Sequence, residues 1–284
     1  QLEDAVPMTL GQTFGAFASI LRDEVKHLND AAEEFLTVNM GATAIGTGIC
    51  SEPGYASKCT AALAQVTGWN IRLAEDLVAA TSDTSCMVGY SSVLRRIATK
   101  MNKICNDLRL LGSGPRCGLH EMDLPARQPG SSIMPGKVNP VIPEVMNQIS
   151  YKVIGNDLCV AMCNEAAQME LNAMEPTMAQ CCFESCEIMM NGFDVLRKYC
   201  VDGIKADEEN CRNYIRGSIG IVTALNPVIG YKNSTKIAKE ALATGRPVYD
   251  LVIEHGILTK EELDIILSPE NMIKPVKLNI KPRR

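Results

Sequence analysis

The residues best suited to chemistry lie together in one short segment, Gly130–Pro140, which reads GSSIMPGKVNP. Lys137 supplies a positive charge for a carboxylate or a phosphate, and Asn139 supplies both a donor and an acceptor of hydrogen bonds. Ser131 and Ser132 are candidate nucleophiles, bases or anion donors, and a serine acts as a base only where nearby donors and positive potential stabilise its alkoxide. The segment therefore indicates either an anion-binding loop that carries a serine base or a structured turn with a capping serine.

The backbone of this segment points the same way. Gly130 and Gly136 permit conformations that are closed to other residues, and they allow a ligand to come close to the chain. Pro135 and Pro140 prevent a helix from running through the segment. We expect the next helix to begin near Pro140 to Pro143. The loop would then lie at a helix N-terminus, where free N–H groups and the helix dipole favour anions.

Other chemistries are weakly supported. The phosphate-binding order GxxxxGK[ST] and the nucleophile pattern GxSxG do not match, and the three histidines, His27, His120 and His255, lie far apart. The twelve cysteines include no CxxC pair, so they predict free thiols in a reducing cytoplasm and no metal site. A net charge of −5 argues against binding to nucleic acid or to a membrane surface. We also find no apolar run long enough to cross a bilayer.

The elements that must position the loop are long helices, because apolar residues recur with heptad spacing. The stripes along the chain are Phe14, Leu21, Leu28 and Phe35; Leu94, Ile97, Met101, Ile104, Leu108 and Leu111; and Met146, Ile149, Val153, Asn156, Val160, Cys163 and Ala167. A fourth helix is expected from Pro176 to about Cys200. Such repeats predict near-parallel packing, either within one chain or against other subunits. Asn156 would fix the register of its seam.

The chain is therefore predicted to be all-α, with two domains. Residues 1–204 would form a long central helical bundle that carries the loop at 130–140. Residues 205–284 would form a small helical C-terminal domain, in which Thr259 to Glu262 reads as a capping box that opens a helix ending near Ser268 and Pro269.

GSSIMPGKVNP also resembles the signature loop of the aspartase/fumarase superfamily, G-S-S-x-M-P-x-K-x-N-P, at all eight fixed positions. Further resemblances cover essentially the whole chain, among them ATAIGTGI, KICNDLRLLGSGPR, YKVIGND and SIGIVTALNPVIG. Within the superfamily they are similar to aspartate ammonia-lyases and to class II fumarases. QLEDAVPM at the start of the chain and MEPTMAQCCFES (residues 174–185) favour the ammonia-lyase branch.

The resemblance implies a carbon–nitrogen lyase that eliminates ammonia from L-aspartate to give fumarate without an organic cofactor. Ser131 would be the general base, removing the proton from the carbon beta to the amino group. The neighbouring carboxylate would take up the charge as an aci-carboxylate before the ammonium group leaves. The positions carried over as substrate-binding are Ser132, Met134, Lys137, Asn139 and Gln1.

Glu144 is carried over as a supporting residue. In fumarases its counterpart pairs with a histidine at the position of Gln1, and glutamine cannot act as an acid or a base. That relay should therefore not operate here. The plain structural interpretation of Glu144, a favourable charge near a helix N-terminus, is equally well supported.

The resemblance further implies a cytoplasmic homotetramer whose active sites are shared between subunits, and an N-terminal portion that precedes the segment seen here. We therefore expect these 284 residues alone to be inactive or nearly so. Two alternatives stay open: a class II fumarase, and a non-catalytic structural role. No acidic cluster places an allosteric or divalent-metal site.

Overall fold

The computed structural model describes residues 3–282 and falls into two compact units. The bundle unit comprises Phe17–Ser113 and Leu124–Ile204. The terminal unit comprises the described residues up to Ala16, the segment Gly114–Asp123, and the described residues from Lys205 onward. The two predicted domains, with a boundary after residue 204, stay a proposal. The described residues before Phe17 and the segment Gly114–Asp123 belong to the same compact unit as the residues after 204.

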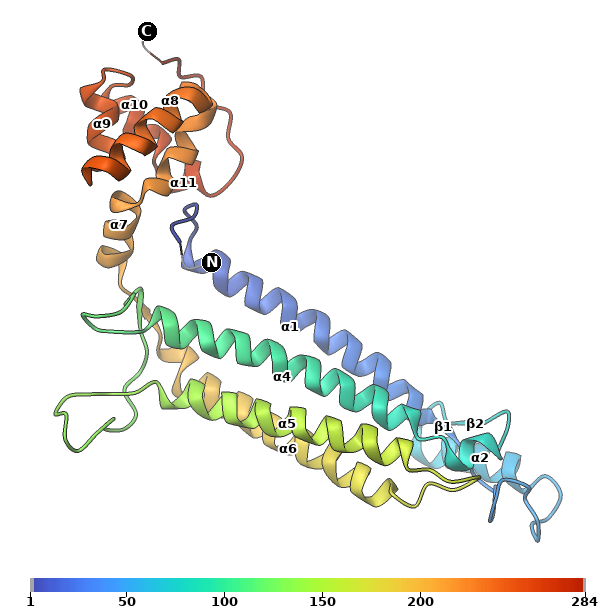
Figure 1. Cartoon of the computed structure of the whole chain (residues 1–284). Coiled ribbons are helices and arrows are strands. Elements are labelled where there is room, and N and C mark those ends of the chain that lie inside the picture. Colours follow the sequence, from blue (N-terminus) through green and yellow to red (C-terminus); the bar gives the residue numbers. More distant parts are fainter. Residues whose placement is uncertain (1–2, 283–284) are drawn as a thin grey trace. The chain divides into compact units, whose positions relative to one another are not determined.

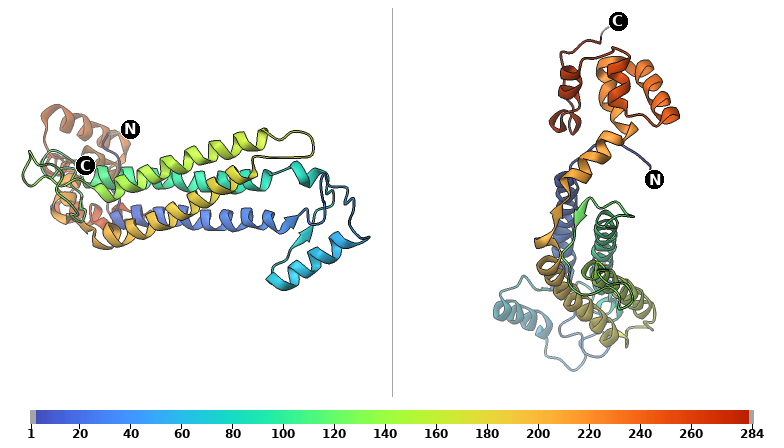
Figure 2. Two further views of the ribbon diagram at one scale, coloured as in Figure 1. Left: turned by 90° about the horizontal axis from the view of Figure 1, so that it is seen from below. Right: turned by 90° about the vertical axis from the view of Figure 1, so that its left-hand side faces the viewer.

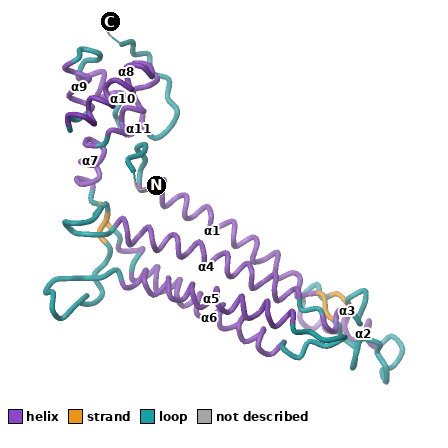
Figure 3. The backbone as a smooth tube through the Cα atoms, viewed as in Figure 1, coloured by secondary structure: helices purple, strands orange, loops and turns teal. Residues whose placement is uncertain are grey.

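Long helices dominate the bundle unit, which confirms the all-α prediction (Figures 1 and 3). They are α1 (Leu10–Ala32, in this unit from Phe17), α4 (Ser85–Leu111), α5 (Val141–Glu165) and α6 (Glu175–Tyr199). Figure 2 shows them running side by side, and α5 packs against both α4 and α6. As predicted, Pro176 lies in the first turn of α6. No helix among residues 3–282 is long and apolar enough to span a membrane.

Short elements complete this unit at the ends of the long helices. They are η1 (Glu33–Leu36), β1 (Thr37–Val38), α2 (Tyr55–Thr67), β2 (Arg72–Leu73), α3 (Ala79–Ser82) and η2 (Val201–Gly203). β1 and β2 pair in parallel, with Thr37 opposite Arg72.

The apolar stripes of α4 and α5 form the core between these helices. Buried members of the two stripes are Leu94, Ile97, Met101, Ile104, Leu108, Met146, Val153, Asn156 and Val160. Leu111, Ile149 and Cys163 are only half-buried, and Ala167 lies beyond the end of α5. Asn156 is satisfied within the chain, because its amide donates to Glu184 Oε2 at 2.9 Å and to Ser185 Oγ at 3.0 Å, both on α6.

α1 departs from the predicted stripe. Phe14, Leu21 and Leu28 are only half-buried, and Phe35 lies beyond the helix in η1 with 38% of its surface exposed. The buried positions lie three residues further along and are Phe17, Glu24 and Ala31. The predicted seven-residue period of α1 was therefore right, but the set of residues predicted to be buried was wrong. A seven-residue repeat contains two such lines, and the neighbouring helix decides which is more deeply covered.

A carboxylate occupies the middle of that buried line. Glu24 is 1% exposed, and its Oε1 lies 2.5 Å from Lys100 Nζ and 2.8 Å from Arg96 Nη2, both on α4. Burial opposes ionisation, but the hydrogen bonds and charges of these two cations prevail and lower the pKa of Glu24. The contact between α1 and α4 is therefore partly ionic.

The terminal unit is built from shorter elements. They are β3 (Met122–Asp123), β4 (Lys205–Ala206), α7 (Glu208–Gly217), η3 (Ile219–Ile221), α8 (Val222–Thr244), α9 (Val248–Glu254), α10 (Lys260–Ile266) and α11 (Pro269–Met272). β3 and β4 pair antiparallel, with Met122 opposite Ala206. Residues from η3 to α10, among them Leu225, Leu251 and Leu263, share one apolar core.

Two local signals shape this unit. The capping box of Thr259 and Glu262 is present and opens α10, as predicted. α10 ends at Ile266, and Pro269 begins α11. α8 is broken at Gly230, whose φ of 77° lies in a region that glycine tolerates best.

Candidate active site

The signature loop (Gly130–Pro140) closes on itself directly before α5. The Gly130 N–H donates to the Lys137 carbonyl oxygen at 2.6 Å, and the Lys137 N–H donates to the Met134 carbonyl oxygen at 3.2 Å. Gly136 has a φ of 82°. A Cβ atom at Gly130 would lie 2.9 Å from the Lys137 carbonyl oxygen. Glycine is therefore the residue that fits at position 130. The hydrogen bond between Gly130 and Lys137 encloses Ser131 and Ser132 in the same closed loop as Lys137.

Ser131, the predicted base, is half-buried inside this closed loop. Its Oγ accepts a hydrogen bond from the Ile133 N–H at 3.2 Å. A donor aimed at a hydroxyl oxygen favours the alkoxide over the neutral hydroxyl. The loop backbone therefore supplies one of the donors that a serine base requires.

The other predicted site residues take different positions around the loop. Ser132, Met134 and Lys137 are exposed, and Asn139 and Glu144 are half-buried. The Asn139 Oδ1 lies 3.1 Å from the position a Cβ of Gly130 would occupy, so this amide sits against the closure of the loop. Gln1 lies outside the described residues. The structure thus brings Ser131, Lys137 and Asn139 together on one loop that faces solvent.

The start of α5 offers less to an anion than we expected. Pro140 and Pro143 have no N–H, and the Val141 N–H donates to the Asn139 carbonyl oxygen at 2.8 Å. Three of the four amide positions at the helix start are therefore unavailable to a ligand. Positive charge for an anion must come mainly from Lys137. Glu144 stands in the first turn of α5, where the helix dipole favours a carboxylate.

A polar cluster that we did not predict lies between α5 and α4, close to the end of α5 that follows this loop. Asn147, in the second turn of α5, is 3% exposed and hydrogen-bonds to three side chains of α4: those of Asn102, Asn106 and Arg109. The signal in the sequence was a polar residue next to Met146 in an apolar seam. The partners on α4 could be identified only from the fold.

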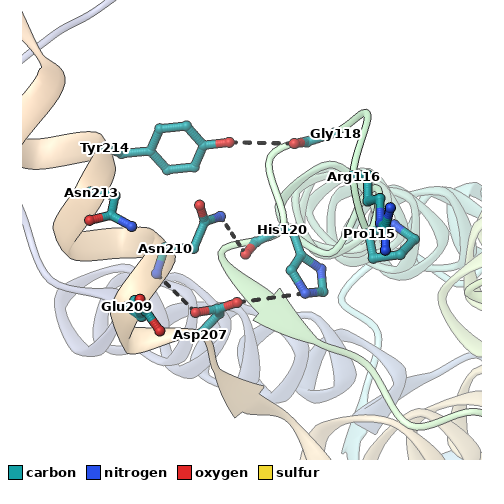
Figure 4. Close-up of a pocket in the computed structure, with 9 residues that line it drawn as sticks. All are labelled: Pro115, Arg116, Gly118, His120, Asp207, Glu209, Asn210, Asn213 and Tyr214. Carbon is teal, nitrogen blue, oxygen red and sulfur yellow. Dashed lines mark hydrogen bonds and ion pairs between the residues drawn. The ribbon is translucent and has the colours of Figure 1, made fainter.

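The terminal unit contains a separate cavity of about 340 Å³ (Figure 4). Segment 114–123 lines one side, and the start of α7 lines the other. His120 Nε2 lies 3.6 Å from Asp207 Oδ2, and Asn210 donates to the His120 carbonyl oxygen at 2.8 Å. The predicted site residues that the structure describes are not among those lining this cavity.

Within residues 3–282, no three histidine, cysteine, aspartate or glutamate side chains form a group that could hold a metal ion. The chemistry that the side chains of the signature loop offer is that of hydroxyl, ammonium and amide groups. It suits proton abstraction next to a carboxylate held by a cation.

Comparison with protein families matches residues 1–155 to a family described as lyase and residues 221–274 to one described as fumarase C C-terminus. An aspartate ammonia-lyase of Pseudomonas canavaninivorans is 53% identical over 99% of this chain and 60% of its own length. One from Escherichia coli (strain K12) is 52% identical over 97% of this chain and 58% of its own length. The chain thus spans about 60% of the length of these relatives.

Solved structures agree with these relationships. A fumarate lyase:delta crystallin from Brucella melitensis, bound to cobalt, aligns with a TM-score of 0.92 at 49% identity, covering 97% of this chain and 60% of that one. A recombinant class II fumarase from Schistosoma mansoni aligns with a TM-score of 0.88 at 31% identity, covering 95% and 60%.

Proposed function

Because the chain belongs to the lyase family that matches its residues 1–155, we propose that the whole protein is an aspartate ammonia-lyase. Its reaction would eliminate ammonia from L-aspartate to give fumarate. The observation that carries the proposal is the signature loop, complete in sequence and closed by the hydrogen bond between Gly130 and Lys137. The aspartate ammonia-lyases among its relatives support this substrate over others.

We assign the proton transfer to Ser131. The Ser131 alkoxide takes one proton from the carbon beta to the amino group, and the electron pair of that C–H bond moves into the adjacent carboxylate. The resulting aci-carboxylate collapses, forms the double bond of fumarate and breaks the C–N bond, so that ammonia leaves with its own electron pair. The Ile133 N–H at 3.2 Å from Oγ supports the alkoxide that this step requires.

The remaining loop residues would hold the substrate. The doubly charged intermediate needs a cation and fixed donors close to its carboxylates. Lys137 supplies the cation, and Ser132 and Asn139 supply donors from the same loop. Met134 and Gln1 would complete the contacts to the substrate, and Glu144 would support the loop from the first turn of α5.

We also propose that the whole protein is a cytoplasmic homotetramer whose active sites combine residues of several subunits. Exposed apolar side chains on α5 and α6 support this assembly: Tyr151, Leu158, Met162, Phe183 and Met190 are 58–73% exposed. Tyr151 and Leu158 are seven residues apart, as are Phe183 and Met190. Exposed apolar side chains at heptad spacing are suited to packing against the helices of a second copy of the chain.

The proposed activity is tested with the whole protein and two substrates. Incubation with L-aspartate should release fumarate and ammonium in equal amounts. Incubation with fumarate should yield aspartate only when ammonium is present. Malate formed from fumarate without ammonium would instead identify a fumarase, and the absence of turnover on both substrates would reject a catalytic role in this reaction.

A further inference from the structure

One buried amide connects the signature loop with the bundle behind it. Asn147 follows the loop by less than three helical turns, and no flexible segment separates the two, because α5 runs continuously from Val141. Any rotation or sliding of α5 against α4 would therefore move the residues that α5 carries at its start.

The hydrogen bonds of Asn147 are directed entirely at α4. Its Nδ2 donates to Asn102 Oδ1 at 2.8 Å and to Asn106 Oδ1 at 3.2 Å, and its Oδ1 accepts from Arg109 Nη1 at 3.3 Å. A further contact joins Nδ2 to the Asn102 carbonyl oxygen at 3.3 Å. Both the nitrogen and the oxygen of the Asn147 side-chain amide are thus hydrogen-bonded to α4.

This arrangement disfavours other registers of α5 on α4. Asn102, Asn106 and Arg109 lie on one face of α4 at helical spacing, and Asn147 is 3% exposed. Turning α5 by one residue rotates it by about 100°, which would leave the buried amide without partners. Asp157 on α5 makes a second polar contact with α4, to Ser91 Oγ at 2.9 Å and Arg95 Nη1 at 3.2 Å, but it lies ten residues further from the loop. The Asn147 cluster therefore fixes the register of α5 on α4 at the end of the helix that the loop joins.

We propose that Asn147 is a positioning residue for the lyase reaction: by locking α5 against α4, it sets where Ser131, Lys137 and Asn139 stand. The proposal rests on the function assigned above. Asn147 is not placed against substrate, and it acts only through the helix that follows the loop. Displacement of a reacting group by about 1 Å can cost on the order of 100-fold in rate.

The chain contains a matched control. Asn156 lies on the same helix, is 5% exposed, and is hydrogen-bonded to α6 rather than α4. It is more than two turns further from the loop. Asn147→Leu and Asn156→Leu each remove a buried amide of the same size, so both should lower the melting temperature.

The test compares kcat in the whole protein at a temperature where both variants are folded. Asn147→Leu should lower kcat about 10- to 100-fold, whereas Asn156→Leu should leave it unchanged. Where the leucine variant fails to fold, Asn147→Ala with Asn156→Ala replaces the pair, since alanine removes the amide without adding bulk or charge and favours the helix. An equal effect of both members of a pair on kcat would overturn the proposal.

A second measurement does not depend on turnover. Hydrogen exchange at the Gly130 amide, which closes the loop onto Lys137, should accelerate in Asn147→Leu and stay as in the wild type in Asn156→Leu. If the wild-type protein has no lyase activity, the proposed function fails and this exchange comparison alone decides whether Asn147 positions the loop. Unchanged exchange in both variants would reject that role.

Discussion

At the scale of single residues, the proposed chemistry depends on one half-buried hydroxyl and its surroundings. The Ser131 Oγ accepts a hydrogen bond from the nearby Ile133 N–H, and this contact lies within the loop itself. Such a local hydrogen bond at a partly exposed site contributes on the order of 1 kcal/mol or less to stability. The role of Ser131 in the fold is therefore small compared with its assigned role in proton transfer.

This contrast predicts the outcome of Ser131→Ala. In the whole protein it should abolish release of fumarate from aspartate while leaving the melting temperature and the assembly nearly unchanged. Steady-state kinetics and thermal unfolding of the same preparation check both parts. Ser132→Ala is the neighbouring control, with weaker substrate binding expected. Unfolding of the Ser131→Ala protein would identify a structural residue instead.

The buried ion pairs of Glu24 predict how the stability of the fold depends on pH. Its pKa is lower in the folded chain than its ordinary value of 4.5, because Lys100 and Arg96 outweigh the effect of burial. Ionised Glu24 therefore stabilises the fold above the unfolded-state pKa, and this stabilisation is lost as the pH falls through the lower folded-state pKa. Glu24→Gln should reduce the free energy of unfolding at neutral pH by about 2–4 kcal/mol.

Urea denaturation on both sides of pH 4.5 measures this effect. The difference between wild type and Glu24→Gln should shrink as the pH falls below that value. Glu187, an exposed glutamate on α6, provides the control, since Glu187→Gln should change little. A difference for Glu24→Gln that stays constant with pH would contradict this account of the ion pair.

At the scale of elements, the close approach of α5 and α6 depends on a glycine. Gly192 on α6 is buried, and a Cβ there would lie 2.7 Å from Ile149 Cδ1 and 3.1 Å from Met146 Sδ of α5. A larger side chain must separate the helices or force these residues from their preferred rotamers. Gly192→Val should therefore destabilise the chain by about 1–3 kcal/mol.

Denaturant unfolding measures the loss in the free energy of unfolding for Gly192→Val, and Gly15→Val serves as its control. Gly15 lies on α1, and a Cβ there would have no neighbouring atom within 4 Å among the described residues, so the same substitution tests helix propensity alone. Similar losses at the two glycines would show that α5 and α6 tolerate a wider separation.

At the scale of the whole molecule, the proposed assembly predicts how exposed apolar residues respond to charge. Leu158→Glu and Phe183→Glu place a carboxylate on the exposed lines of α5 and α6. Each should convert a tetramer into smaller species, because a charge buried in an interface without a partner is costly. Analytical ultracentrifugation of the whole protein gives the mass directly.

Val66 on α2 is 85% exposed but lies outside these two helices. Val66→Glu should therefore leave the assembly intact. A wild-type protein that sediments as a monomer would rule out the tetramer, and dissociation by Val66→Glu as well would show that the heptad lines are not the specific contact.

The amino-acid sequence determined the features whose signals are local. The signature loop, the helices on both sides of it, the first-turn position of Pro176 and the capping box at Thr259 each depend on neighbours in the chain. Periodicity also predicted the seams of α4 and α5. These features were predictable because turns, caps and amphipathic faces are set by residues a few positions apart.

Only the tertiary structure decided which surfaces meet. Periodicity gave the heptad of α1 but not that Glu24 would be buried between Lys100 and Arg96. It could not pair Asn147 with Asn102, Asn106 and Arg109 of another helix, nor group segment 114–123 with residues after 204. Contacts between residues distant in sequence depend on how helices pack, and packing is specified by the whole set of side chains at once.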